Sequence, residues 1–155
     1  MNTIKVRDIE IGAGAPKIIV PIVGVTKDDI IAEAKTFDSI PVDMVEWRVD
    51  WFENVFEFDK VEEVLKELRD ALGNIPILMT FRTSKEGGEK AIEPEAYAKL
   101  NIQAAQTGYV DFVDVEIFTG DEIVKKIIDG VHAAGARVIA SNHDFFKTPA
   151  QSDIV

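Results

Sequence analysis

The sequence predicts one α/β domain in which parallel strands alternate with helices. Short apolar runs recur at intervals of roughly 30 residues, and segments with helical spacing of their apolar residues lie between them. Strands that successive helices connect in this way lie parallel, with right-handed crossovers. The chain has 155 residues, 46% of them hydrophobic, which is enough for one ordinary core. We expect a single domain over 1–155, composed of a hairpin (1–14), βα units (17–147) and the start of a helix (148–155).

The strands are predicted from their length and composition. Ile4–Arg7 and Ile9–Ile11 alternate apolar and polar residues, which predicts a small hairpin with one covered face. Five later runs are short, nearly continuous and rich in β-branched residues, as strands buried on both faces are. These runs are 18–23, 44–49, 77–81, 112–117 and 138–140. Pro21 lies within the first run and indicates an edge strand or a local irregularity, because proline cannot donate to a neighbouring strand.

Four helices are predicted between these runs. Thr26 is suited to cap the first and Pro94 to begin the third, because threonine caps helix starts and proline is tolerated there. Gly73 and Gly135 are suited to end the second and the fourth. The expected helices begin near residues 26, 58, 94 and 121. The capping box Thr148–Gln151 predicts one more helix that begins at its proline, with barely one turn inside the chain.

Composition excludes several classes of function. The formal net charge is -11, and 17 Lys and Arg are dispersed among 28 Asp and Glu, which argues against nucleic acid as a partner. No apolar stretch reaches the ~20 residues of a membrane-spanning helix, and the N-terminus lacks the apolar core of a signal peptide. There is no cysteine, which excludes disulfides, thiol catalysis and zinc–thiolate sites. We expect a cytoplasmic protein.

Polar residues stand two apart at the carboxyl end of four successive strands. Members of each pair share a face of their strand, because strand side chains alternate between faces. Ligands of parallel α/β folds bind at the carboxyl ends of the strands, so four successive pairs predict a site. The pairs are Glu46/Arg48, Thr80/Arg82, Asp114/Glu116 and Ser141/His143. Structural ion pairs are the alternative, and Asp114 and Glu116 best suit the role of orienting their neighbours.

His143 is the candidate catalytic residue. It is one of two histidines, lies at a strand end and has Asn142 and Asp144 beside it. An imidazole among carboxylates and guanidiniums is suited to proton transfer. We interpret His132 as a structural residue near a helix C-terminus, and Asp50 and Asp144 as solvated loop acids.

The segment Ser84–Lys90 directly follows Arg82. Two glycines among charged residues predict a flexible loop that could move over a site, although an ordinary surface loop has the same composition. Glu86 could fold back from this loop toward the pocket. The chain contains no glycine-rich phosphate-binding motif.

These motifs together resemble those of the type I 3-dehydroquinate dehydratases. The resemblance rests first on Asp114–Ile117 followed by Val138–Asp144, and then on Glu46–Asp50 and on Phe81–Thr83 with Glu86–Gly88. It implies a (β/α)8 TIM barrel, here truncated to roughly five parallel strands and four helices after the hairpin.

The resemblance also implies an activity. Family members convert 3-dehydroquinate to 3-dehydroshikimate by a syn dehydration through a Schiff base, with no metal or other cofactor. It implies that His143 moves the protons and that Glu86 orients or tunes it. The substrate's hydroxyls and carboxylate would be held by Glu46, Arg48 and Arg82. Because an imine is an electron sink, a base as weak as imidazole can remove a neighbouring proton.

The chain departs from the family pattern at its end. The Schiff-base lysine and the last three strands belong beyond His143, and the chain ends before them. Lys147 is the nearest lysine, but its surroundings do not suggest the desolvated pocket that a nucleophilic lysine needs. We therefore expect an N-terminal fragment that is inactive, or nearly so, by itself.

Two other interpretations remain open. A non-catalytic half-barrel could self-associate as a homodimer, because a partial barrel exposes two sheet edges and its inner face. Such a dimer would bury Ile19, Met79 and Val115 between its copies. The other interpretation is a metal-assisted enzyme. Its ligands would be Glu46, Asp114, Glu116 and His143. The positive charges of Arg48 and Arg82 on the same face would compete with a metal ion for these ligands.

Overall fold

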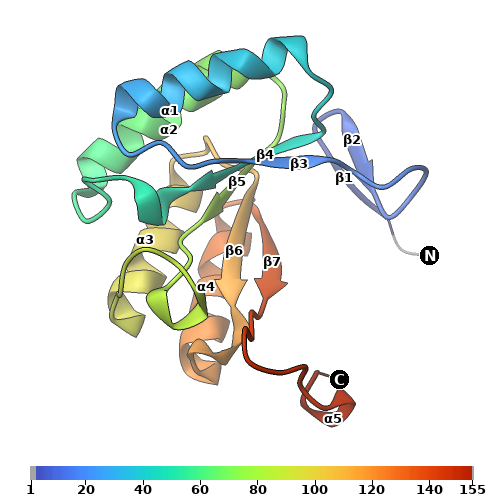
Figure 1. Ribbon diagram of the computed structural model, residues 1–155, viewed down its shortest axis with the longest axis vertical. Helices are drawn as coiled ribbons and strands as arrows, with labels where there is room; N and C mark the ends of the chain where they lie inside the picture. The colour runs from blue at the N-terminus through green and yellow to red at the C-terminus, as the bar shows by residue number, and fades with distance from the viewer. Residues whose placement is uncertain (1–2, 155) are drawn as a thin grey trace.

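A five-stranded parallel sheet forms the centre of the computed structural model, which describes residues 3–154 (Figure 1). The strands lie side by side in chain order, as expected for successive βα units. They are β3 (Ile19–Ile22), β4 (Met44–Arg48), β5 (Ile77–Thr80), β6 (Phe112–Glu116) and β7 (Arg137–Ser141). The predicted strand order and parallel direction are therefore confirmed.

Four helices connect these strands, and their ends agree with the capping signals. They are α1 (Lys27–Ala34), α2 (Phe58–Leu72), α3 (Pro94–Gln106) and α4 (Asp121–Ala133). Thr26 and Asp29 form a reciprocal capping box at the start of α1. Gly73 ends α2 with φ 55°, a conformation that glycine adopts without strain. The last helix, α5 (Gln151–Ile154), begins two residues later than its proline predicted.

The helices cover one face of the sheet, here called the outer face. Trp47, Met79 and Val115 lie on it, fully buried in the main core with the apolar stripes of the helices. The dimer interpretation placed Met79 and Val115 between two copies, and this is wrong. Each of the two residues lies next to a polar strand-end residue in the sequence. Because successive strand side chains point to opposite faces, Met79 and Val115 face the helices. Ile19 alone of the three is accessible, with 44% of its surface exposed.

The amino end of the opposite, inner face is closed by the hairpin. Strands β1 (Ile4–Val6) and β2 (Ile9–Ile11) pair antiparallel, as predicted. Their side chains pack against one residue from each of three strands, forming a second, smaller core. That core contains Met44, Leu78 and Phe112, with Val6, Ile9, Ile11 and Ile139 around them. The carboxyl end of the inner face is left to polar residues.

Both outer strands of the sheet have a free edge. Pro21 lies in β3, which agrees with the edge position that its missing N–H predicts. Beyond β7, the side chains of Phe145 and Phe146 are exposed, Phe146 to 99%. Among residues 3–154, no helix has both the length and the apolar character needed to cross a bilayer.

Candidate functional site

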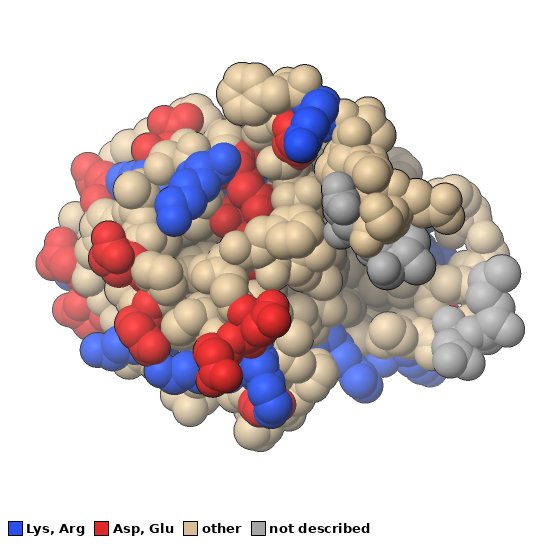
Figure 2. Space-filling model, turned by 90° about the horizontal axis from the view of Figure 1, so that it is seen from below, with Lys and Arg blue, Asp and Glu red and all other residues tan. Residues whose placement is uncertain are grey.

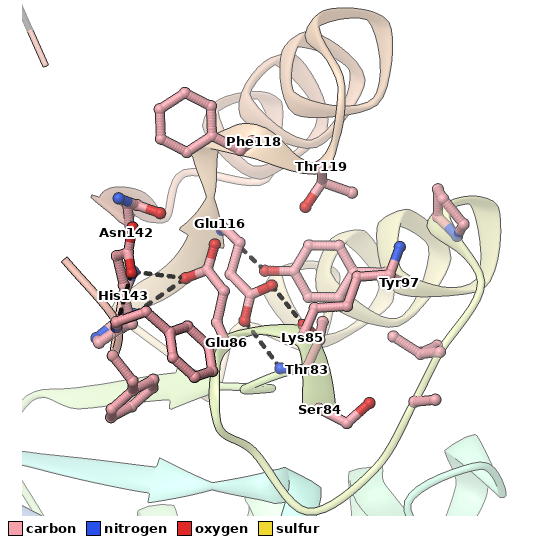
Figure 3. Close-up of a pocket in the computed structure, with 16 residues that line it drawn as sticks. Thr83, Ser84, Lys85, Glu86, Tyr97, Glu116, Phe118, Thr119, Asn142 and His143 are labelled. Carbon is pink, nitrogen blue, oxygen red and sulfur yellow. Dashed lines mark hydrogen bonds and ion pairs between the residues drawn. The ribbon is translucent and has the colours of Figure 1, made fainter. Parts of the chain in front are cut away.

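His143 and Glu86 form a direct pair at the carboxyl end of the sheet (Figure 3). His143 follows the end of β7, and Glu86 lies in a 3-10 turn (Ser84–Glu86) after β5. One carboxylate oxygen, Oε2, lies 3.0 Å from the ring Nδ1 and accepts the backbone N–H of His143 at 2.9 Å. The His143 side chain is 41% exposed, whereas that of Glu86 is 11% exposed. The buried carboxylate therefore fixes the ring at Nδ1, and Nε2 is the nitrogen left for a ligand.

Arg82 is surrounded by three carboxylates, two from β6 and one from the loop after β5. Its Nη2 lies 2.9 Å from Asp114, and its Nη1 lies 3.1 Å from Glu116 and 3.6 Å from Glu86. Nη1 also donates to the Ser141 hydroxyl at 3.1 Å, and this hydroxyl donates to Asp114 at 2.8 Å. One guanidinium thus serves three acids in a place where little water reaches them. Of the predicted strand-end pairs on β5, β6 and β7, all members except Thr80 meet in one cluster with Glu86.

The electrostatics of this cluster follow from its burial. Desolvation raises the pKa of the Asp114 carboxyl above its usual range, and Arg82 and Ser141 partly oppose this shift. The nearby charge of Glu46 adds to the rise. Burial also raises the pKa of the Tyr97 hydroxyl, which bridges the backbone of β6 by donating to the Asp114 carbonyl and accepting from the Glu116 N–H.

Glu116 holds the first residue of the loop that carries Glu86. Its carboxylate accepts the Thr83 N–H and the Thr83 hydroxyl, both at 2.8 Å. Together with its ion pair to Arg82, these bonds occupy both oxygens. These contacts agree with the interpretation of Asp114 and Glu116 as residues that orient their neighbours, which stays a prediction. Among the described residues, no three His, Asp or Glu side chains are gathered to hold a metal ion.

Arg48 is held by Asp50, which the sequence interpretation placed in solvent. Arg48 donates through Nε and Nη2 to the two oxygens of Asp50, each at 2.8 Å, and this raises the pKa of Arg48. Asp50 is 0% exposed, so its interpretation as a solvated loop acid is wrong. The signal was present in the sequence, because Asp50 stands two residues past Arg48 and continues the spacing of the strand-end pairs.

The segment Ser84–Lys90 is tied down rather than free. Its ends are joined by the Ser84 N–H bond to the Lys90 carbonyl at 2.9 Å, and Lys90 Nζ donates to the carbonyls of Asp50 and Phe52. At Gly88, an added Cβ would lie 1.8 Å from the Arg82 carbonyl, so only glycine fits. The expectation of a flexible loop is therefore replaced by a compact, hydrogen-bonded one.

A cavity of about 400 Å³ lies among the loops that follow β5, β6 and β7. Glu86, Glu116 and His143 line it, with Tyr97 and Phe118 as apolar walls (Figure 3). The other predicted substrate-binding residues, Glu46, Arg48 and Arg82, do not line this cavity. Arg82 contacts Glu86 directly, Arg48 is linked to the cluster through Asp50, and half-buried Glu46 acts on it only through its charge.

The charged surface is mixed on the face shown in Figure 2. Lysine and arginine side chains are scattered there among aspartate and glutamate, rather than gathered in one broad basic area. This distribution agrees with the acidic composition of the chain.

Comparison with known proteins decides the family. A family model for type I 3-dehydroquinase matches residues 18–155. The chain belongs to the type I 3-dehydroquinase family. Curated 3-dehydroquinate dehydratases of Clostridium botulinum and Clostridioides difficile are 47% and 49% identical to it over 152 residues, which is 98% of this chain and 60% of each relative. The chain thus spans about 60% of the length of these relatives, which are lyases.

Solved structures of type I 3-dehydroquinases agree with this assignment. The Clostridium difficile enzyme, determined with covalently modified comenic acid, superposes with a TM-score of 0.95 at 48% identity and covers 99% of this chain. The Geobacillus kaustophilus enzyme superposes with a TM-score of 0.93 at 30% identity. In each case the chain covers 60% of the solved structure. The predicted fold, five parallel strands and four helices of a TIM barrel after a hairpin, is confirmed.

Proposed function

We propose that this chain provides the proton-transfer part of a 3-dehydroquinate dehydratase site, which converts 3-dehydroquinate to 3-dehydroshikimate. The observation that carries the proposal is the Glu86–His143 pair at the carboxyl end of the sheet, in a member of the type I 3-dehydroquinase family. No metal or other cofactor is needed for this reaction. The cytoplasmic location expected from the sequence stays a prediction.

In the proposed reaction His143 acts through Nε2. Glu86 holds Nδ1, so the imidazole keeps one tautomer and one orientation while Nε2 takes a proton from the substrate and later returns it to the leaving hydroxyl. The negative charge of Glu86 stabilises the imidazolium that forms in between. Glu46, Arg48 and Arg82 would hold the hydroxyls and the carboxylate of the substrate, which is the role that the resemblance to the family assigns to them.

The Schiff-base lysine of the proposed reaction comes from outside residues 1–155. Lys90 is the lysine whose pKa burial lowers, but its Nζ is bound to the carbonyl oxygens of Asp50 and Phe52. Because both bonds hold this nitrogen against the backbone, Lys90 is not placed to attack a ketone. Lys90 is therefore a structural residue in this proposal.

The experiment joins this chain to the remaining C-terminal part of the Clostridioides difficile relative and follows dehydration of 3-dehydroquinate. We expect the joined protein to be active and the 155-residue chain to be inactive or nearly so. His143→Ala in the joined protein should lower kcat by about 10³-fold or more. His132→Ala is the matched control, because His132 is the other histidine and lies exposed near the end of α4.

An active His143→Ala variant, or loss of activity in His132→Ala as well, would contradict the proposed role of His143. A joined protein that folds and binds 3-dehydroquinate but never dehydrates it would contradict the proposed activity itself. Folding is checked by circular dichroism before either conclusion is drawn.

We also propose that the 155-residue chain forms a homodimer. Ile18, Ile19 and Val23 are exposed at the free edge of β3, and Phe145 and Phe146 are exposed beyond the free edge of β7. Free edges and exposed apolar side chains favour association. Light scattering at micromolar concentration should give the mass of a dimer, and a clean monomer would defeat the proposal.

A further inference from the structure

Asp50 is a fully buried acid of the site to which the proposed reaction gives no role. It lies in the 3-10 turn Val49–Trp51 directly after β4, and none of its surface is exposed. A buried carboxylate is costly unless several donors surround it, so its position requires compensating hydrogen bonds. The identity of these donors indicates what Asp50 does.

The donors are a neighbouring side chain and two backbone N–H groups that lie more than 30 residues away in the sequence. Arg48 uses two nitrogens, each 2.8 Å from a different oxygen of Asp50. The backbone N–H of Arg82 donates to Oδ1 at 3.3 Å, and the backbone N–H of Glu89 donates to Oδ2 at 3.1 Å. One carboxylate therefore joins the ends of β4 and β5 to the loop after β5.

This loop is the one that delivers Glu86 to His143. Its two ends are fastened to each other by the Thr83–Lys90 bridge and by the Ser84 N–H bond to the Lys90 carbonyl. Asp50 holds the loop on one side through Glu89, and Lys90 Nζ adds a bond to the Asp50 carbonyl at 2.8 Å. Asp50 therefore holds the loop that carries Glu86 and also orients the Arg48 guanidinium.

We propose that Asp50 is a positioning residue that holds the Arg48 guanidinium and the Glu86–His143 pair in one fixed relative geometry. The substrate-holding part of this statement rests on the proposed function, whereas the geometric coupling between Arg48, the loop and His143 does not. Asparagine cannot replace it, because an amide offers one acceptor oxygen where four N–H groups converge on two oxygens.

The test measures backbone amide hydrogen exchange by NMR on the 155-residue chain. The reporter is the His143 N–H, which is protected by Glu86 and has no contact with Asp50. In Asp50→Asn we expect exchange at His143 to rise by about tenfold or more relative to wild type, since a bond to a charged acceptor is lost. The N–H of Asp111, which bonds to Ile77 at the opposite end of the sheet, serves as the internal reference.

Glu89→Gln is the matched control. It removes a carboxylate charge from the same loop but keeps the backbone N–H that binds Asp50. We expect His143 exchange to change by less than about twofold in this variant, because the loop keeps all its bonds. An equal rise in both variants would show that charge, and not positioning, is responsible, and would overturn the proposal.

Arg48→Gln keeps the proposal testable if Asp50→Asn does not fold. Arg48 is partly exposed, and its loss frees the two oxygens of Asp50 from their strongest donors. Coupling then predicts faster exchange at both Glu89 and His143. Unchanged exchange at His143 relative to Asp111, in either variant, would overturn the proposal.

A second readout separates this proposal from the proposed function. In the joined active protein, Asp50→Asn should lower kcat and raise KM together, because proton transfer and substrate holding both depend on it. If the joined protein is inactive, the proposed function fails while the exchange result on the 155-residue chain stands. If activity is present and exchange at His143 is unchanged, the positioning role alone fails.

Discussion

The two ends of the sheet each carry an arginine–carboxylate cluster, and the two clusters have opposite balances of charge. At the amino end one acid, Asp111, binds two arginines: Arg7 at 2.6 Å and Arg69 at 3.0 Å. The remaining N–H groups of Arg69 donate to the backbone carbonyls of Tyr109, Gly73 and Ile75. These bonds fasten the hairpin and helix α2 to the loops before β5 and β6.

At the carboxyl end the ratio is reversed. One arginine, Arg82, faces Glu86, Asp114 and Glu116. At each end, burial disfavours the ionised form of the groups whose charge is in excess. It raises the pKa of Asp114 at the carboxyl end and lowers the pKa of Arg69 at the amino end. The surplus arginine charge at the amino end is taken up by backbone carbonyls, whereas the surplus acids at the carboxyl end remain next to an open cavity.

This difference distinguishes the structural cluster around Asp111 from the candidate functional site around Arg82. A buried charge is costly unless partners compensate it, and at the amino end backbone carbonyls provide this compensation. An acid-rich cluster beside a partly exposed histidine keeps its capacity to stabilise positive charge. The imidazolium and the protonated imine of the proposed reaction are such charges.

Removing the central arginine of each cluster is the strongest test of the comparison. Arg82→Met leaves three buried acids without their counter-charge and should lower the free energy of unfolding by about 3–5 kcal/mol. Arg69→Met leaves Asp111 with Arg7 and the Ile77 N–H, and should cost about 1–2 kcal/mol. Urea denaturation followed by circular dichroism measures both. Equal losses would show that the two clusters are energetically alike.

Asp111→Asn tests the amino-end cluster and should have an intermediate effect on the free energy of unfolding. Neutralising Asp111 weakens its bonds to Arg7 and Arg69, and we expect a loss of about 1–3 kcal/mol. The hairpin should loosen more than the rest, so amide exchange of β1 and β2 should rise while that of His143 stays as in wild type. Faster exchange at His143 would contradict the independence of the two ends.

The dependence of stability on pH should be the smallest of these effects, but the direction of the change is well defined. Because burial raises the folded-state pKa of Asp114, its contribution to stability is complete below the unfolded pKa of about 3.9 and is lost as pH rises through the folded pKa. The stability of wild type minus that of Asp114→Asn should therefore fall as the pH rises above about 4. Thermal unfolding at several pH values measures this difference.

Asp144→Asn is the control with the opposite sign. The backbone N–H groups of Phe146 and Lys147 lower the pKa of Asp144, so its contribution is present above the unfolded pKa and is lost as pH falls. Asp144 is exposed, and the effect should be slight. The same trend in both variants would contradict the assignment of Asp114 as a desolvated acid.

The fold could be predicted because each of its signals is local. Alternating βα segments, Thr26 at a helix start and Gly73 at a helix end act within a few residues, and the structure follows them. The two-residue spacing of the strand-end pairs predicted the shared face correctly. It also implied that Met79 and Val115 lie on the other face, a consequence that the dimer interpretation overlooked.

The connections of the site could be predicted only in part. The Glu86–His143 pair came from the resemblance to a family, since the two residues lie 57 positions apart and no local pattern joins them. The burial of Asp50 depends on two N–H groups from the segment after β5, which only the folded chain brings to it. A sequence pattern predicts which face of a strand a residue lies on. Whether a charged residue can be buried depends on hydrogen-bond donors that are distant in the sequence.

The proposed function assigns the proton-transfer part of the site, and not its covalent part, to residues 1–155. Borohydride trapping with 3-dehydroquinate, followed by intact mass measurement, tests it directly. The chain is treated alone and together with a separate C-terminal piece of the Clostridioides difficile relative. We expect no adduct on the 155-residue chain and an adduct on the added piece. A covalent adduct on any lysine of residues 1–155 would contradict the claim.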